Sequence, residues 1–260
     1  MKKMLLLAGE GKIPLLVYKK AKQEGEVLIL SCPLFSLPRE LKPDLWMDGL
    51  SLAQVLEIIE QEEITHLCLA GKIPKDLVFE EDLLHGELKG LFSSISKWQD
   101  QALLQVVVEK LQEVVEIVPP LFFLEEYLTP PGKIAGRDPS PREWEDISYG
   151  ARIARFLADE EIGQTVVVKR GTVLALEGAE GTDETIKRGV SLGKEEVVVV
   201  KVARSRQSFL IDVPAIGEET VRHLQKGGII ALEAGKTFLL DREEIEKEAE
   251  RRGVGIVGIS

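Results

Sequence analysis

The chain has 260 residues, of which 44% are hydrophobic, and its formal net charge at pH 7 is −11. This length and composition are those of a globular protein with one large core or two smaller ones, and they exclude a disordered chain. Because acidic residues outnumber basic ones, the composition also excludes a general nucleic-acid binder, while a local basic pocket stays open.

The sequence predicts a cytoplasmic protein without a membrane span. No apolar run approaches the roughly 20 residues needed to cross a bilayer. The apolar run near Met1 is too short for a signal peptide and predicts a first β-strand instead. Cys32 and Cys68 lie in or beside apolar runs and form no metal-binding pair, so we expect buried, reduced thiols.

The first half of the chain alternates segments of strand and helix character. Apolar residues recur at helical spacing before Gly25 ends the first helix, and apolar runs flank that helix on both sides. Alternation of this kind indicates a parallel sheet covered by helices. The predicted strands are residues 4–8, 26–31, 65–71 and 115–120, and the predicted helices are residues 14–25, 52–63 and 102–114.

A Pro- and Gly-rich stretch between about Phe122 and Ser140 is the predicted linker. We therefore expect an α/β protein of two domains. Residues 1–130 would form an N-terminal Rossmann-like domain with a parallel sheet, and residues 131–260 a C-terminal mixed α/β domain that carries the main catalytic motifs.

The second half opens with a predicted helix and then becomes rich in strands. Pro139-Ser140-Pro141 supplies a helix start, and acidic residues in the first turn suit the helix dipole. Arg170-Gly171 is a plausible tight hairpin turn. The predicted helices are residues 141–161 and 241–253, with another beginning near Thr185, and the predicted strands are residues 164–169, 172–176, 195–203, 228–235 and 254–260.

The earliest candidate site is the turn from Gly9 to Pro14, which includes Gly11 and lies between a strand and a helix. Backbone amides at such a turn favour a phosphate or another anion, but the turn is neither a complete dinucleotide fingerprint nor a P-loop. Gly71-Lys72 repeats the arrangement, so two strand ends can converge on one crevice. The alternative is that the glycines only make a tight turn.

A denser polar constellation runs from Glu177 to Asp183 and includes Glu180, Gly181 and Thr182. Its carboxylates and hydroxyl are suited to hold a hard cation or to orient a water molecule. The alternative is that Thr182 or Asp183 only caps the following helix.

The third candidate follows the predicted strand that ends near Lys201. Lys201, Arg204 and Arg206 form a basic cluster in an acidic protein, which suits an anionic ligand such as a pyrophosphate. Asp212 stands in an apolar context, where a carboxylate needs a metal, a basic partner or a capping role. The alternatives are a solvated basic loop and a structural hydrogen bond near Pro214.

The order of these motifs resembles that of the UDP-2,3-diacylglucosamine pyrophosphatases of the LpxI type. The resemblance runs over essentially the full length and is strongest in the second half. It is carried by LLLAGEGKIPLLVYKKAKQEG, LAGKIPKDL, DQALLQVVVEKLQ, IGQTVVVKRGTVLALEGAEGTDETIKRG, VVVVKVARSRQSFLIDVPAIGEETV and IALEAGKTFLLDR.

The resemblance implies hydrolysis of UDP-2,3-diacylglucosamine to UMP and 2,3-diacylglucosamine 1-phosphate in lipid A synthesis, with Mg²⁺ as the cofactor. It places the family's important aspartate, lysine and glutamine on Asp212, Lys201 and Gln207. Asp212 would bind the metal or orient a water, while Lys201 and Arg206 would stabilise phosphoryl oxygens. The constellation around Gly181 would line the same cleft.

One part of the chain departs from the family pattern. Relatives usually carry Gln-Asp-x-Arg-x-Asp, whereas this chain has Ser208 and Leu210 in place of the first acid and the base. The departure leaves two alternatives, which are a pyrophosphatase for another nucleotide sugar and a non-catalytic binder of an acylated sugar phosphate. Peripheral contact with the inner membrane and a homodimer also stay open.

Overall fold

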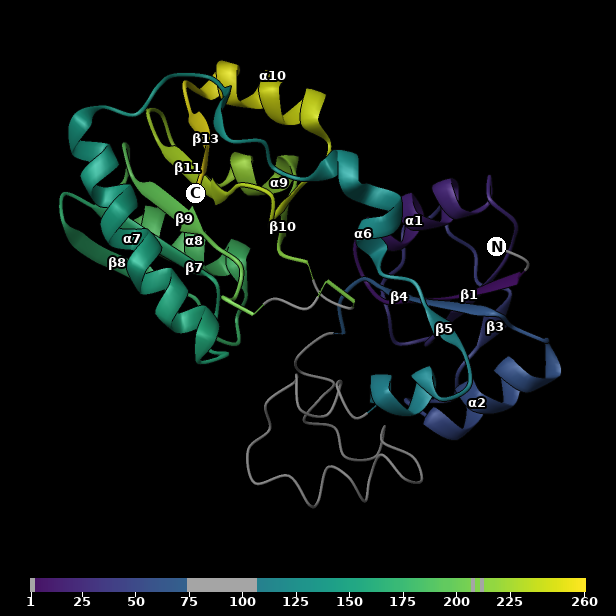
Figure 1. Ribbon diagram of the computed structural model, residues 1–260. Helices are drawn as coiled ribbons and strands as arrows, with labels where there is room; N and C mark the ends of the chain where they lie inside the picture. The colour runs from purple at the N-terminus through teal and green to yellow at the C-terminus, as the bar shows by residue number, and fades with distance from the viewer. Residues whose placement is uncertain (1–2, 74–106, 207–208, 211–212) are drawn as a thin grey trace. The chain divides into compact units, whose positions relative to one another are not determined.

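The computed structural model describes residues 3–73, 107–206, 209–210 and 213–260 (Figure 1). The chain divides into two compact units, and the first takes in a short segment from the second half of the chain. We call residues 3–125 with 209–210 unit 1, and residues 126–206 with 213–260 unit 2, and describe each by itself.

Unit 1 is built on a five-stranded sheet in which every neighbouring pair of strands is parallel. The strand order is β3-β2-β1-β4-β5, so β1 lies in the centre. From β1 the chain first adds β2 and β3 on one side of the sheet, and then β4 and β5 on the other. The parallel sheet predicted for this half of the chain is confirmed. The strands are β1 (Lys3–Ala8), β2 (Glu26–Ser31), β3 (Leu45–Trp46), β4 (His66–Ala70) and β5 (Glu116–Ile117).

Helices cover the sheet of unit 1, as the alternation of segments predicts. α2 (Leu52–Gln61) and the helical residues 107–112 bury their apolar sides against β1, β2 and β4. α1 (Ile13–Ala21) contacts β1, β2 and β4, and α6 (Pro120–Leu124) packs on α1. The predicted helix 102–114 is described only from residue 107 onward.

Unit 2 contains a mixed six-stranded sheet in the order β6-β13-β11-β9-β7-β8. β9, β11 and β13 are parallel to one another, β6 is antiparallel to β13, and β7 is antiparallel to both β9 and β8. β10 (Ala215–Ile216) and β12 (Phe238–Leu239) form a separate parallel pair. The six strands are β6 (Gly132–Ala135), β7 (Thr165–Lys169), β8 (Thr172–Leu176), β9 (Val198–Lys201), β11 (Ile229–Glu233) and β13 (Gly255–Ile259).

Four helices of unit 2 pack around this sheet, and their starts follow the local sequence. α7 (Pro141–Asp159) begins with a capping box between Ser140 and Glu143, which confirms the helix start predicted there. α8 (Thr182–Gly193) begins three residues earlier than expected. The remaining two helices are α9 (Glu218–Arg222) and α10 (Arg242–Arg252).

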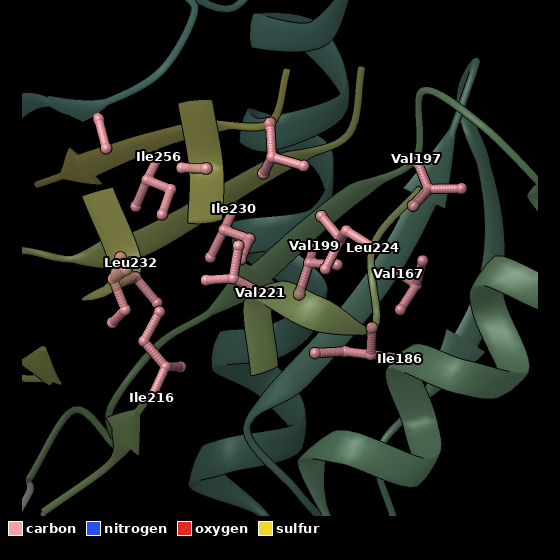
Figure 2. Close-up of a cluster of buried hydrophobic side chains, with 14 of the residues drawn as sticks. Val167, Ile186, Val197, Val199, Ile216, Val221, Leu224, Ile230, Leu232 and Ile256 are labelled. Carbon is pink, nitrogen blue, oxygen red and sulfur yellow. The ribbon is translucent and has the colours of Figure 1, made fainter. Parts of the chain in front are cut away.

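The long valine runs of unit 2 follow from the burial of both faces of its sheet. Along β9, Val198 and Val200 pack with α7, whereas Val199 belongs to the cluster on the opposite face. Figure 2 shows side chains of that second cluster, among them Ile186 from α8 and Val221 from α9. Because successive strand residues point to opposite faces, a sheet covered on both sides needs apolar residues at every position.

The predicted linker between about residues 122 and 140 is not wholly irregular. It contains α6, a short 3₁₀ helix (Glu125–Tyr127) and β6. β6 pairs antiparallel with β13, although Pro and Gly surround it in the sequence. A partner strand far along the chain therefore outweighs the local turn signal.

Gly150 lets α7 approach the sheet closely, which gives a stability prediction. A Cβ atom there would lie 2.8 Å from Cγ2 of Val200, so Gly150→Ala should lower the free energy of unfolding by about 1–3 kcal/mol. In a Val200→Ala background the 2.8 Å contact is removed, but Cγ2 of Val168 at 3.1 Å and the Cβ atom at position 200 at 3.3 Å remain. The same change should therefore cost less there than in the wild-type background, helped by the higher helix propensity of alanine, worth about 1 kcal/mol. Denaturant midpoints of the four proteins check this difference; an equal cost in both backgrounds would contradict it.

Candidate functional site

Three charged residues of unit 2 lie at the carboxyl ends of strands that run in the same direction. β8 and β9 are both antiparallel to β7 and therefore run in the same direction, which β11 shares. Glu177 directly after β8, Lys201 at the end of β9 and Glu233 at the end of β11 thus lie along one edge of the sheet. We call this edge the carboxyl edge of unit 2, the location where ligands bind in many α/β sheets.

Lys201 is the centre of this edge. Its side chain is buried, with a relative exposure of 5%, and its Nζ donates a hydrogen bond of 2.6 Å to Oγ1 of Thr182. The Thr182 hydroxyl in turn donates to Oε1 of Glu177 at 3.0 Å. A hydroxyl therefore connects the ammonium group to a carboxylate, and two predicted site residues, Lys201 and Thr182, are brought into direct contact.

The electrostatics of the edge keep Glu177 ionised. Burial by itself would raise the pKa of Glu177, but the Lys201 charge, the backbone N–H of Gln164 and the Thr182 hydroxyl outweigh it, and the net pKa is lowered. The Gln164 N–H donates to Oε2 of Glu177 at 3.1 Å. Glu177 belongs to the predicted constellation, but no separate role was predicted for it.

The other acids of the constellation face other partners. Glu180 pairs with Arg188 and accepts from the Thr185 hydroxyl, both in α8, and Asp183 accepts a hydrogen bond of 3.0 Å from Thr220 of α9. Gly181 is the N-cap of α8, with φ +83° and no capping side chain. The alternative that Thr182 or Asp183 is the capping residue is therefore wrong, because both already belong to the first turn.

The chain that follows β9 is held by residues outside the predicted site. Glu233 and Arg155 contact the backbone of Ala203, and Asp159 contacts Ser205. An acid at the end of an otherwise apolar strand was the available signal for Glu233, whereas the chain carries no local signal that pairs it with Arg155.

The rest of the third motif differs in its exposure. Arg204 is half-buried, and Arg206 is exposed. Both follow Lys201 within a few residues of the sequence. Gln207 and Asp212, together with Ser208, lie outside the described residues. Their roles stay predictions from the resemblance.

In unit 1 the two Gly-Lys turns converge, as expected for neighbouring parallel strands. Glu10 and Lys72 form an antiparallel bridge, with the Glu10 N–H donating at 2.8 Å and the Lys72 N–H at 3.0 Å. A Cβ atom on Gly9 would lie 2.6 Å from the Lys72 carbonyl oxygen, while nothing lies within 4 Å of one on Gly11. Gly9 thus has a packing role, and Gly11 stays the candidate for close approach by a ligand.

No cluster of three or more His, Cys, Asp or Glu side chains that could hold a metal ion is found among the described residues. Within the same ranges, no helix combines the length and the apolar character that crossing a bilayer requires.

The lowered pKa of Glu177 predicts how stability depends on pH. Because the folded-state pKa lies below the ordinary value of 4.5, the ionised group stabilises the fold above pH 4.5, and this contribution is lost as pH falls through the lowered pKa. Glu177→Gln should therefore cost about 1–2 kcal/mol at pH 7 and progressively less below pH 4.5. Urea unfolding across this range checks the trend; a cost that grows in acid would contradict it.

Comparisons with known proteins agree with the two-part organisation of the chain. The family model described as the LpxI N-terminal domain matches residues 3–127, and that of the LpxI C-terminal domain matches residues 130–257. UDP-2,3-diacylglucosamine pyrophosphatase LpxI of Caulobacter vibrioides is 26% identical over 279 residues, which cover 100% of this chain and 98% of the relative. The chain belongs to the LpxI family.

Proposed function

We propose that this protein hydrolyses the pyrophosphate of UDP-2,3-diacylglucosamine to UMP and 2,3-diacylglucosamine 1-phosphate in lipid A biosynthesis. Membership of the LpxI family over both domains supports this activity, as does the name of the Caulobacter relative. The observation that carries the proposal is the buried Lys201 ammonium at the carboxyl edge of unit 2, hydrogen-bonded to Thr182. A fixed cation at the end of a strand suits an anionic phosphoryl group.

The reaction adds one water across a phosphoric anhydride. A P–O bond forms to the water oxygen, and the bond from phosphorus to the bridging oxygen breaks, which leaves two phosphate monoesters. In this proposal Lys201 stabilises the charge that develops on the phosphoryl oxygens, Arg206 adds a second cation, and Gln207 contacts the substrate. Asp212 orients the attacking water.

Carboxylates of the candidate motifs are chemically suited to Mg²⁺, the metal that the resemblance implies. Magnesium is usually held by one or two carboxylates together with substrate phosphates. Asp212 would hold the ion, and Glu177, whose pKa is lowered, offers a second ionised oxygen donor. When bound, the ion would draw charge from the phosphoryl oxygens.

For unit 1 we propose a Rossmann-like, nucleotide-binding role. The strand order β3-β2-β1-β4-β5 supports it, because β1 and β4 are the strands at which the direction of the chain connections reverses. The turns with Gly11 and Lys72 follow these two strands. Anions are favoured where such a turn leads into a helix.

Replacing Lys201 by Met tests the cation at the carboxyl edge. Because the methionine keeps most of the apolar stem and loses the charge, we expect a fold with little change and a kcat lower by about 10²–10³-fold. UMP release from UDP-2,3-diacylglucosamine in the presence of Mg²⁺ measures it. Lys187→Met is the matched control, because Lys187 is an exposed lysine of α8 that pairs with Glu184 on the helix surface, and it should leave turnover unchanged.

Asp212→Ala and removal of divalent cations test the other half of the mechanism. Both should abolish UMP release, and added Mg²⁺ should restore activity to the chelated wild-type protein but not to the variant. Unchanged turnover in Asp212→Ala would remove its assigned role. A wild-type protein that cleaves only another nucleotide sugar, or that binds an acylated sugar phosphate without turnover, would replace the proposed substrate or the proposed enzyme class.

A further inference from the structure

Both backbone polar groups of Ala203, two residues beyond Lys201, are held by charged side chains. The Ala203 N–H donates to Oε2 of Glu233 at 2.9 Å, and the Ala203 carbonyl accepts from the Arg155 guanidinium. Arg155 also pairs with Oε1 of Glu233 at 2.5 Å. Arg155 of α7, Glu233 of β11 and the backbone of Ala203 thus form a closed ring of three contacts.

A second contact lies at Ser205, two residues further along. Its backbone N–H donates to Oδ1 of Asp159 and its hydroxyl to Oδ2, both at 2.7 Å. Arg155 and Asp159 are four residues apart and so lie on the same side of α7. The last turns of α7 therefore hold the chain at two successive positions after β9.

Stability alone is a weak reason for this arrangement. Glu233 is buried, with a relative exposure of 5%, and a buried ion pair often contributes no more than apolar side chains of similar volume would. Lys236 adds a second cation at 2.9 Å from Oε1 of Glu233. What the ring does supply is a fixed path for the backbone between the buried Lys201 and the residues that lead to Arg206.

We infer that Arg155, Glu233 and Asp159 are positioning residues for the reaction. They set the direction in which the chain leaves β9 and thereby place the residues after Ala203 relative to the Lys201 ammonium. None of the three needs to touch substrate. The inference rests on the proposed function for its effect on turnover, but the hold on the backbone can be measured without substrate.

The test compares Glu233→Gln with Glu248→Gln. Glu248 is also buried and is paired with Arg251 and Arg252, which hold its pKa at about 2. It lies near the segment before β11, since Arg252 also donates to the Leu224 carbonyl, and so away from the carboxyl edge. Both changes remove one buried charge from unit 2, but only Glu233→Gln loosens Ala203.

We expect both variants to lower the thermal midpoint of unfolding. Only Glu233→Gln should also lower kcat, by about 10–100-fold with KM changed less than threefold, because small displacements of reacting groups slow the reaction. Arg155→Met should behave like Glu233→Gln, and Arg155→Lys should recover part of kcat. Equal kcat in Glu233→Gln and Glu248→Gln, for folded protein, would overturn the inference.

Hydrogen exchange separates failure of this inference from failure of the proposed function. In Glu233→Ala, without substrate, the amides of Ala203 and Ser205 should exchange at least about tenfold faster, while amides in the middle of β7 should not change. If the wild-type protein releases no UMP, the proposed function fails, and hydrogen exchange alone tests the hold on the backbone. Local acceleration in Glu233→Ala then supports that hold, whereas unchanged or uniformly faster exchange overturns it.

Discussion

The buried ammonium of Lys201 is the constraint around which the carboxyl edge of unit 2 is arranged. A charge removed from water is costly unless polar partners surround it, and Lys201 has a relative exposure of only 5%. Thr182 meets that need from the first turn of α8, and its hydroxyl passes the interaction on to Glu177. The start of α8 and the end of β8 are therefore fixed in relation to one side chain of β9.

A second buried charge of opposite sign ends the neighbouring strand. Glu233 on β11 has Arg155, Lys236 and the Ala203 N–H as partners, whereas the Lys201 charge helps to lower the pKa of Glu177. Both buried charges are thus held by polar partners, which keeps their side chains in place at the carboxyl edge.

The fold was predictable where one physical signal dominates. Long valine runs indicate a sheet covered on both faces, and Ser140 with Glu143 marks the start of α7. The sequence could not predict β6, because its pairing with β13 depends on residues more than a hundred positions away. It also could not join Arg155, Ala203 and Glu233, since only the packing of α7 beside β9 and β11 brings those positions together.

The candidate site was predictable in the same uneven way. Lys201 and Thr182 are in contact, although β7 lies between β8 and β9 in the sheet. Glu180 and Asp183 instead contact Arg188 and Thr220. A polar loop contains more carboxylates than one site uses, and only the backbone path decides which of them point to the lysine. Glu177 was the least conspicuous acid of the loop because it directly follows a strand, yet that place puts it on the carboxyl edge.

The replacements at Ser208 and Leu210 are best judged by charge. Relative to the family pattern they remove one acid and one base together, so the net charge of the segment is unchanged. The proposed attraction of a pyrophosphate to Lys201 and Arg206 would therefore be retained. The replacements remove the directional hydrogen bonds that a guanidinium and a carboxylate make. Such bonds contribute more to the orientation of a phosphoryl group than to its attraction. In the proposed site, orientation would then come from the backbone that carries the remaining groups, and Glu233 and Arg155 hold that backbone at Ala203.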